Sequence, residues 1–318
     1  MGRSIAVVYT PDDNLEHAFQ LIRPAQALNG GYPIRDVSFS PGTQGKVGIG
    51  MPYTPLNTIW VVAAAYCPID GMRYLFYATS DNKVYWTRFS KNYINPPNDP
   101  VVQGNGNLRV ADFPGYQQPN SIIDMAAYFT GSEVEVVVLM SDGYIWRMGG
   151  APWTGSLAWS QVPIWANFAG AKRIALFEGA GWGHILVASD FSITEVWYRW
   201  NGFGQTRLWT FNSKISDVGA FYDSGGTAHV ITSVASQNGT DVYDIRYVPA
   251  QVAPSQNLLG HVPFTIDSLG AYQKPDGGMH VIMQEPPPYN NREILYLSWY
   301  LPWWPGFQYS GWPQQSAW

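Results

Sequence analysis

The sequence predicts an all-β protein, a single β-propeller with six blades of mostly four antiparallel strands. Three observations support this fold class: a composition rich in aromatic and turn residues, short apolar strands that recur along the chain, and a recurrence interval of the length of a propeller blade. The 318 residues include 15 Trp, 20 Tyr and 14 Phe, together with 32 Gly and 24 Pro. Aromatic side chains favour strands, whereas Gly and Pro favour the turns between them.

The first strand of the repeat is apolar and ends in an aromatic residue. These terminal aromatics are Tyr66, Tyr128, Phe177, Phe221 and Tyr272. Successive members lie 62, 49, 44 and 51 residues apart in the sequence. A propeller blade takes about 40–50 residues, so the chain is long enough for about six blades. The N-terminal stretch does not close the register, which leaves five or seven blades as alternatives.

Each first strand is followed by a Gly-containing turn, a second apolar strand, a polar turn and a third strand of alternating aromatic and polar residues. This alternation is typical of half-buried β-structure. The expected second strands are 74–78, 136–140, 185–188, 230–234 and 281–283, and the expected third strands are 84–89, 144–148, 193–200, 242–247 and 294–300. We expect no long helix and one domain over residues 1–318, its ring closed by pairing of the N- and C-terminal strands.

The N-terminal part is less regular than the rest. Residues 5–10 and 16–22 are predicted to be a second and a third strand, joined by a polar turn. Residues 34–40 and 46–51 are predicted to be the first and second strands of another unit.

Charge and cysteine content narrow the classes of function. With 18 basic and 23 acidic residues the formal net charge is −5, and no basic cluster exists for nucleic acid to bind. No apolar run is long enough for a membrane helix, and the N-terminus lacks a secretory leader, so we expect a cytoplasmic protein. The single cysteine, Cys67, excludes an internal disulfide framework and a Cys-based zinc cluster.

Short motifs resemble those of a known family of sugar-binding propellers. The stretch from Arg73 to Val84, RYLFYATSDNKV, and the Pro-containing ending that closes on Trp318 are similar to the fungal fucose-specific lectins, which are six-bladed propellers. In that family each sugar pocket lies between blades and uses an Arg that opens the second strand, a Glu on the third strand and an aromatic ring. Here the Arg position reads Arg73, Glu135, His184, His229 and His280 in successive repeats, while Glu is retained at Glu195 and Glu293.

Our main hypothesis rests on the replacement of the family's charged residues at most of these sugar-binding positions. The chain is similar in size and aromatic content to the hetero-Diels–Alderases of fungal tropolone–sesquiterpenoid biosynthesis, which resemble degenerate members of the lectin group. The resemblance implies a pericyclase of secondary metabolism that joins a tropolone o-quinone methide to a humulene-type sesquiterpene in a dihydropyran-forming cycloaddition. Such a reaction requires an apolar pocket, near-attack geometry and a hydrogen-bond donor, with no metal or organic cofactor.

The hypothesis names catalytic and substrate-binding residues. The candidate donors are Arg73, His184, His229 and His280. The candidate walls of the pocket are Tyr74, Trp86, Trp197, Tyr243 and Tyr296. Because equivalent positions of a propeller are spread around its ring, we expect no shared metal site among the histidines. The partner would be a hydrophobic aromatic or terpenoid small molecule.

The alternative is a fucose- or glycan-binding lectin with degenerate sugar pockets between blades. Its pocket residues would be Arg73 with Trp86, His184 with Glu195, or His280 with Glu293. The two hypotheses differ in the polarity of the pocket, because a lectin needs a cation, a carboxylate and a ring in one place. Whether the protein is an enzyme and whether it forms a homodimer both stay open at this point.

Overall fold

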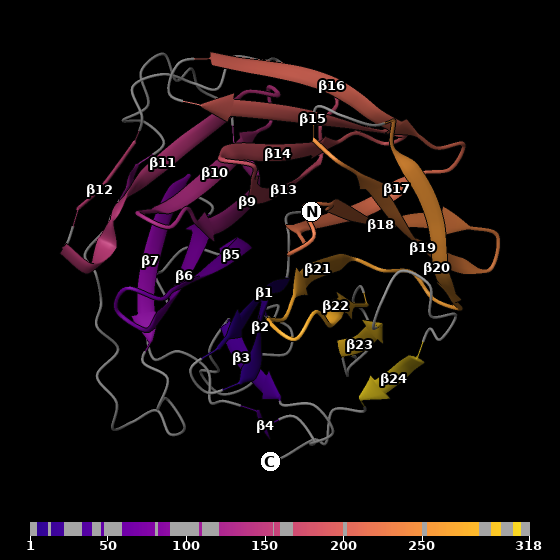
Figure 1. Cartoon of the computed structure of the whole chain (residues 1–318), viewed down its shortest axis with the longest axis horizontal. Helices are drawn as coiled ribbons and strands as arrows, with labels where there is room; N and C mark the ends of the chain where they lie inside the picture. Colours follow the sequence, from indigo (N-terminus) through magenta and orange to yellow (C-terminus); the bar gives the residue numbers. More distant parts are fainter. Residues whose placement is uncertain are drawn as a thin grey trace. The chain divides into compact units, whose positions relative to one another are not determined.

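The computed structural model describes residues 5–11, 14–21, 34–39, 46–47, 59–79, 82–89, 108–109, 121–154, 156–159, 168–199, 202–249, 253–285, 294–299 and 308–312. Within these residues, 24 strands form six antiparallel sheets of four strands each, numbered sheets 1 to 6 in chain order (Figure 1). A short 3-10 helix, Pro152–Thr154, is the one helical element of the described part. No helix in these segments is both long and apolar enough to cross a membrane.

The chain divides into two compact units, residues 1–169 and 170–318, which are described separately. In the first unit, sheet 1 contains β1 (Ile5–Thr10), β2 (Leu15–Leu21), β3 (Ile34–Phe39) and β4 (Lys46–Val47). Sheet 2 contains β5 (Ile59–Cys67), β6 (Met72–Thr79), β7 (Lys83–Phe89) and β8 (Leu108–Arg109). Sheet 3 contains β9 (Ile122–Phe129), β10 (Val134–Met140), β11 (Ile145–Ala151) and β12 (Ser156–Trp159).

The second unit has the same plan. Sheet 4 contains β13 (Arg173–Gly179), β14 (Trp182–Ala188), β15 (Ser192–Arg199) and β16 (Gly202–Thr210). Sheet 5 contains β17 (Ile215–Tyr222), β18 (Ala228–Ser236), β19 (Gly239–Tyr247) and β20 (Ser255–Val262). Sheet 6 contains β21 (Ser268–Gln273), β22 (Met279–Gln284), β23 (Ile294–Trp299) and β24 (Gln308–Trp312).

The six sheets of four strands confirm the predicted number of blades and correct the prediction for the N-terminus. Strands β1 and β2 form a hairpin, and β2 also pairs with β3, so they are the first, second and third strands of one sheet. The prediction that these segments belong to two different blades was therefore wrong. Each sheet consists of four consecutive strands in the described residues, and the pairing of N- and C-terminal strands stays a prediction.

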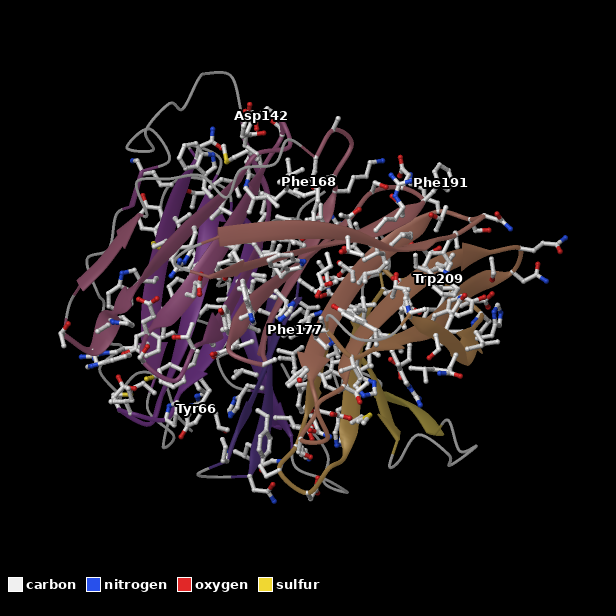
Figure 2. The ribbon with its side chains drawn as sticks, turned by 45° about the horizontal axis from the view of Figure 1, so that its top comes forward. Tyr66, Asp142, Phe168, Phe177, Phe191 and Trp209 are labelled. Atoms are coloured by element: carbon white, nitrogen blue, oxygen red, sulfur yellow. The ribbon has the colours of Figure 1, made fainter. Side chains whose placement is uncertain are left out.

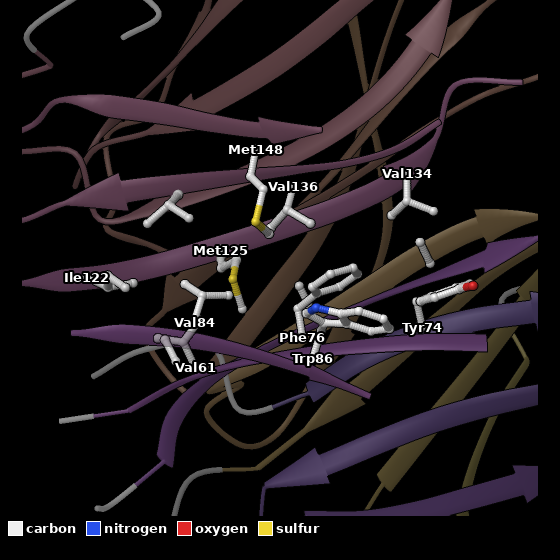
Figure 3. Close-up of a cluster of buried hydrophobic side chains, with 14 of the residues drawn as sticks. Val61, Tyr74, Phe76, Val84, Trp86, Ile122, Met125, Val134, Val136 and Met148 are labelled. Atoms are coloured by element: carbon white, nitrogen blue, oxygen red, sulfur yellow. The ribbon is translucent and has the colours of Figure 1, made fainter. Parts of the chain in front are cut away.

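The central strands of sheets 2 and 5 are largely buried on both faces, because each of these sheets packs between two others of its own unit. All seven residues of β10 in sheet 3 are also buried, and six of them are apolar. Between sheets 2 and 3, Phe76 and Val84 pack against Met125 and Val136 (Figure 3). Between sheets 1 and 2, a second cluster includes Phe19 and Leu75.

The second unit has two equivalent layers of apolar side chains. Leu186 of sheet 4 packs with Val230 and Ile245 of sheet 5. On its other face, sheet 5 presents Ile231 to Leu269 and Val281 of sheet 6. Full burial of such a side chain contributes roughly 1.5–3 kcal/mol, so these layers fix each sheet against its neighbour.

Candidate functional site

One position near the start of the second strand carries a polar or aromatic side chain in all six described sheets. We call it the repeat position, and it is occupied by His17, Tyr74, Glu135, His184, His229 and His280. All six side chains are buried. In sheets 1, 2, 4 and 5 the side chain lies on the face that packs against the next sheet of the same unit. The described strands therefore place four histidines at equivalent points of the fold.

Arg73 does not occupy the repeat position, which corrects the alignment made from the sequence. It precedes Tyr74, and neighbouring strand residues point to opposite faces of a sheet. Arg73 pairs with Tyr66, which packs into the cluster between sheets 1 and 2. There its Nη1 contacts both ring nitrogens of His17, and since a guanidinium only donates, His17 accepts.

A difference of one residue causes this reversal of faces. In sheet 2 the pairing register shifts before Val61, and in sheet 5 it shifts before Asp217. The terminal aromatic Phe221 comes four residues after Asp217, whereas Tyr66 comes five residues after Val61. A slip of one residue moves every following side chain to the other face. Aligning the aromatics of the repeats therefore misplaces Arg73.

The same reversal separates Arg73 from Trp86, so their predicted pocket is not formed. Trp86 lies on the face of Tyr74, with the two ring centroids 5.9 Å apart, and both side chains are buried between sheets 2 and 3 (Figure 3). The Tyr74 hydroxyl donates to Oδ2 of Asp70 at 2.5 Å. Burial, followed by this bond, raises the pKa of Tyr74. Two predicted pocket walls are thus part of the core.

In sheet 4 the structure brings His184 and Glu195 together, as the lectin hypothesis expected of its pocket pair. Nδ1 of His184 lies 2.7 Å from Oε1 of Glu195, and Nε2 lies 3.2 Å from the carbonyl oxygen of Gly179. Both partners are acceptors, so each contact places a ring nitrogen of His184 where it can donate a hydrogen bond. It stacks on Phe177, labelled in Figure 2, with centroids 4.6 Å apart and an interplanar angle of 4°.

Sheet 5 contributes two tyrosines that contact Glu195 and Phe177 of sheet 4. The hydroxyl of Tyr247 donates to Oε1 of Glu195 at 2.7 Å. Burial, and next the charge of Glu195, raise the pKa of Tyr247 well above its usual range. Tyr222 stacks on the ring of Phe177, with centroids 6.0 Å apart. Sequence reasoning missed both tyrosines, because they come from the neighbouring sheet.

Glu195 keeps one carboxylate oxygen open. Oε1 accepts from His184 and from Tyr247, which fixes the carboxylate in place. Oε2 makes no hydrogen bond with any described residue, and it is not sealed from solvent although the residue as a whole is only 4% exposed. A positioned carboxylate oxygen of this kind can accept a hydrogen bond from a ligand.

Two tryptophans lie on the same face as this carboxylate. Trp197 pairs with His184 across the strands and is half-buried. Its ring meets Trp182 edge to face, with centroids 5.2 Å apart and an angle of 90°. A Cβ at Gly204, which pairs with Trp197, would lie 2.0 Å from the indole Cζ2, so the glycine makes room for the ring. We call His184, Glu195, Trp197, Tyr222 and Tyr247 the His184 site.

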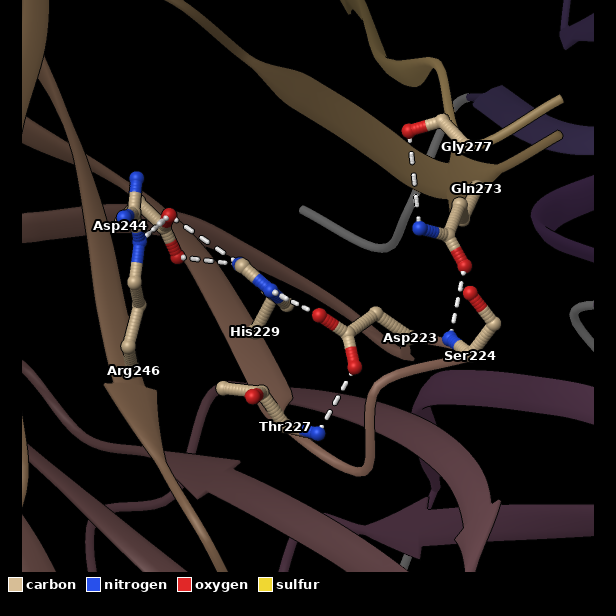
Figure 4. A network of polar contacts seen from close by, with 8 residues as sticks. All are labelled: Asp223, Ser224, Thr227, His229, Asp244, Arg246, Gln273 and Gly277. Atoms are coloured by element: carbon tan, nitrogen blue, oxygen red, sulfur yellow. Dashed lines mark hydrogen bonds and ion pairs between the residues drawn. The ribbon is translucent and has the colours of Figure 1, made fainter. Parts of the chain in front are cut away.

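In sheet 5 the equivalent residues are His229 and Asp244, and other side chains of the protein bind both of them. Nδ1 of His229 lies 3.1 Å from both oxygens of Asp244, and Nε2 lies 3.3 Å from Oδ2 of Asp223 (Figure 4). Arg246 donates from Nε to Oδ2 of Asp244 at 2.5 Å. Sequence reasoning missed Asp244, although Asp244-Ile245 aligns with Glu195-Val196 on the third strand.

The remaining predicted walls lie elsewhere. Tyr243 is on the opposite face from His229, where its ring meets Phe211 at 5.4 Å, and burial, followed by Asp241, raises its pKa. Tyr296 belongs to β23, but its side chain lies outside the described part. Glu293 also lies outside the described residues, so its pairing with His280 stays a prediction.

Sheets 3 and 6 carry different chemistry at the repeat position. Glu135 accepts from the Tyr128 hydroxyl at 2.9 Å and forms an ion pair with Arg147. In sheet 3 the acid thus lies on the second strand and the base on the third, which is the reverse of sheet 4. His280 stacks on Tyr272, with centroids 5.4 Å apart. Burial, and next the charge of Lys274, lower the pKa of His280 to about 3, which keeps this histidine neutral.

Comparison with known proteins identifies the fold. No protein-family model matches the chain, and no curated protein does so. Solved structures similar to it include the SapL1 lectin in complex with α-methyl fucoside, with 17% identity, 99% of this chain and 97% of that chain covered, and a TM-score of 0.68. The fucose-specific lectin from Aleuria aurantia has 14% identity, coverages of 99% and 98%, and a TM-score of 0.69. AofleA from Arthrobotrys oligospora has 12% identity, coverages of 97% and 86%, and a TM-score of 0.65.

These likenesses support the fold and no finer statement. A further structure of the Aleuria aurantia lectin, with a TM-score of 0.64 and 12% identity, is described as a six-bladed β-propeller. The six four-stranded sheets of this chain agree with that description. The chain thus has the six-bladed β-propeller fold that is described for the Aleuria aurantia lectin.

Proposed function

We propose that the chain is a carbohydrate-binding protein and that it binds a neutral sugar at the His184 site. The open Oε2 of Glu195, on the same face of β15 as the half-buried ring of Trp197, is the observation that carries the proposal. Sugars offer hydroxyl donors on their edges and apolar C–H faces, and protein sites bind them with carboxylates and aromatic rings. The lectin alternative is therefore preferred to the enzyme hypothesis.

Each residue of the site has a separate task in this proposal. His184 and Tyr247 both donate to Oε1 of Glu195, which orients the carboxylate. Oε2 accepts from a sugar hydroxyl, and the ring of Trp197 covers the apolar face of the sugar. Among the described residues of the site no cation is left over for an acidic group, since both nitrogens of His184 are engaged. The ligand is therefore a neutral sugar, and fucosides are the first to test because SapL1 was solved with one.

The test is calorimetric titration with α-methyl fucoside, fucosylated oligosaccharides and a panel of other neutral sugars. Glu195→Gln retains the shape of the side chain but weakens its acceptor, so affinity should fall at least about tenfold, the loss of a charge-assisted hydrogen bond. Phe191→Ala, on an exposed turn labelled in Figure 2, is the matched control and should bind like the parent protein. Absence of saturable binding, or binding that Glu195→Gln leaves unchanged, would refute the proposal.

A second candidate function is the hetero-Diels–Alder reaction between a tropolone o-quinone methide and a humulene-type sesquiterpene. One observation favours it: in sheet 2 the positions equivalent to His184 and Glu195 hold Tyr74 and Trp86, two rings in place of a charged pair. Rings of this kind suit hydrophobic substrates better than sugars. Enzyme-dependent formation of the dihydropyran adduct, absent with heat-inactivated protein, would support this candidate. A cytoplasmic location and a homodimer belong to either proposal as predictions.

A further inference from the structure

His229 is enclosed by two carboxylates from different parts of sheet 5. Asp244 of β19 faces its Nδ1, and Asp223 of the β17–β18 turn faces its Nε2 (Figure 4). His229 is 2% exposed and Asp244 is fully buried. Carboxylates accept and do not donate when ionised, so the ring holds both contacts only when both of its nitrogens carry protons.

The turn that Asp223 begins also contacts the next sheet. Oδ1 of Asp223 accepts from the backbone amide of Thr227 at 2.7 Å, which closes the turn 223–227. The backbone amide of Ser224 donates to Oε1 of Gln273 at 3.0 Å, and Gln273 belongs to β21 of sheet 6 (Figure 4). The contact between Asp223 and His229 therefore fixes the turn through which sheet 5 reaches sheet 6.

The residue just before this turn belongs to the His184 site. Tyr222 ends β17, and its ring stacks on Phe177 of sheet 4. Because successive strand residues point to opposite faces, Tyr222 faces sheet 4 while Phe221 faces sheet 6. The end of β17 thus carries Tyr222 toward the His184 site and Phe221 toward His229.

We propose that the proton on Nε2 of His229 fastens the turn 223–227, and that the fastened turn sets the position of Tyr222 at the His184 site. Sugar binding at that site then depends on the protonation of His229. The first half of the proposal stands on the contacts alone, and the second half rests on the proposed function. The neutral ring retains one proton, and Nδ1 keeps it because it faces both oxygens of the fully buried Asp244. Loss of the Nε2 proton then leaves Nε2 and Oδ2 of Asp223 as two acceptors facing each other, so the turn separates from the ring.

The charges around His229 are balanced when all groups are ionised. Asp223 and Asp244 carry the negative charges, and Arg246 joins His229 in carrying the positive ones. From β17, the uncharged ring of Phe221 stacks on the imidazole at 4.9 Å. From sheet 6, the side chain that reaches the turn is the uncharged Gln273, while Lys274 and Asp276 act on His280 instead.

The test uses the full chain with its histidines labelled with nitrogen-15. We expect both ring nitrogens of His229 to be protonated wherever the amide of Ser224 is protected from hydrogen exchange. On raising the pH, ring proton, amide protection and the ring shifts of Tyr222 should change at one common pH. In His229→Gln, which has no second ring donor, protection at Ser224 should be lost at every pH, by about tenfold or more. Asp241→Asn, at the exposed ion pair with His261, is the control and should leave all three signals unchanged.

Affinity for α-methyl fucoside supplies the second readout. It should fall at least about fivefold across the same pH range in the parent protein and stay constant in His229→Gln. A singly protonated His229 with Ser224 still protected would overturn the proposal, as would unchanged Ser224 protection in His229→Gln. If the ring and amide signals change together but no sugar binds at any pH, the proposed function fails and the contact between His229 and the turn is upheld. If a sugar binds with an affinity that does not follow the His229 titration, the coupling to Tyr222 is refuted.

Discussion

Replacement of Asp217 should strongly destabilise the second unit, because this carboxylate joins all three of its sheets. Asp217 lies in β17 and is fully buried. Its Oδ1 accepts from the amide of Val218 at 2.8 Å and lies 3.4 Å from Nε of Arg173 in sheet 4. Its Oδ2 accepts from the amide of Leu269 in sheet 6 at 2.7 Å. Asp217→Ala removes all of these acceptors at once.

The magnitude follows from what the alanine leaves behind. Two buried amides lose their acceptor at roughly 1–3 kcal/mol each, and breaking a buried ion pair on one side costs about 3–5 kcal/mol, contributions that overlap. We therefore expect Asp217→Ala to lower the free energy of unfolding by about 4 kcal/mol. Asp217→Asn keeps one acceptor oxygen and the shape of the side chain, so it should lose about half as much.

Urea denaturation followed by circular dichroism measures both variants against the parent protein. The matched control is Asp241→Ala, because Asp241 is partly exposed and pairs with His261 at the surface. Its effect should stay within about 0.5 kcal/mol. A loss below about 1 kcal/mol for Asp217→Ala would refute the argument that this carboxylate ties the sheets together.

Three further predictions follow from single residues. Gly204→Ala should displace the ring of Trp197, because the new Cβ would lie 2.0 Å from it, and should therefore change the near-ultraviolet dichroism and weaken sugar binding; an unchanged spectrum would contradict this. Gly239→Ala should destabilise the fold by more than about 2 kcal/mol in urea, since φ is +150° and the Cβ would lie 2.0 Å from the carbonyl oxygen of Val262; a smaller loss would show that the hairpin relaxes. Because burial lowers the pKa of His280 to about 3, the unfolded chain takes up a proton below its usual pKa of about 6.5 and the folded chain does not. The free energy of unfolding should therefore decrease as the pH is lowered, by about 2 kcal/mol at pH 5. His280→Phe should remove this part of the pH dependence of stability, and an equal pH dependence in both proteins would argue against the prediction.

Much of the fold could be predicted because its signals are local. Alternating and continuous apolar runs located the first three strands of sheets 2 to 6, and the spacing of the terminal aromatics indicated about six blades, with five or seven as alternatives. The contact between His184 and Glu195 was also within reach, since both residues recur at fixed offsets from turns. At the N-terminus the same reasoning failed, because the strands of sheet 1 are separated by a long segment, residues 22–33, that carries no strand signal.

The parts that could not be predicted depend on faces and neighbours. The sequence alone does not reveal that Val61 to Tyr66 is one residue longer than its counterpart in sheet 5, so Arg73 was assigned to the wrong face. Tyr247 reaches Glu195 from another sheet, 52 positions away in sequence, and no motif links the two. Asp244 was recognisable only by aligning third strands with each other, because Asp replaces Glu there.

The displaced arginine of sheet 2 has a consequence for how such repeats diverge. In a strand buried on both faces, a codon gained or lost upstream transfers a side chain from one inter-sheet space to the one before it. Arg73 illustrates this geometry, since it contacts His17 of the preceding sheet, while Tyr74 occupies the repeat position. A single inserted residue could thus change which side chains occupy two neighbouring positions while every original residue is kept. In a β-propeller, an inserted residue can therefore alter a binding position just as a substitution does.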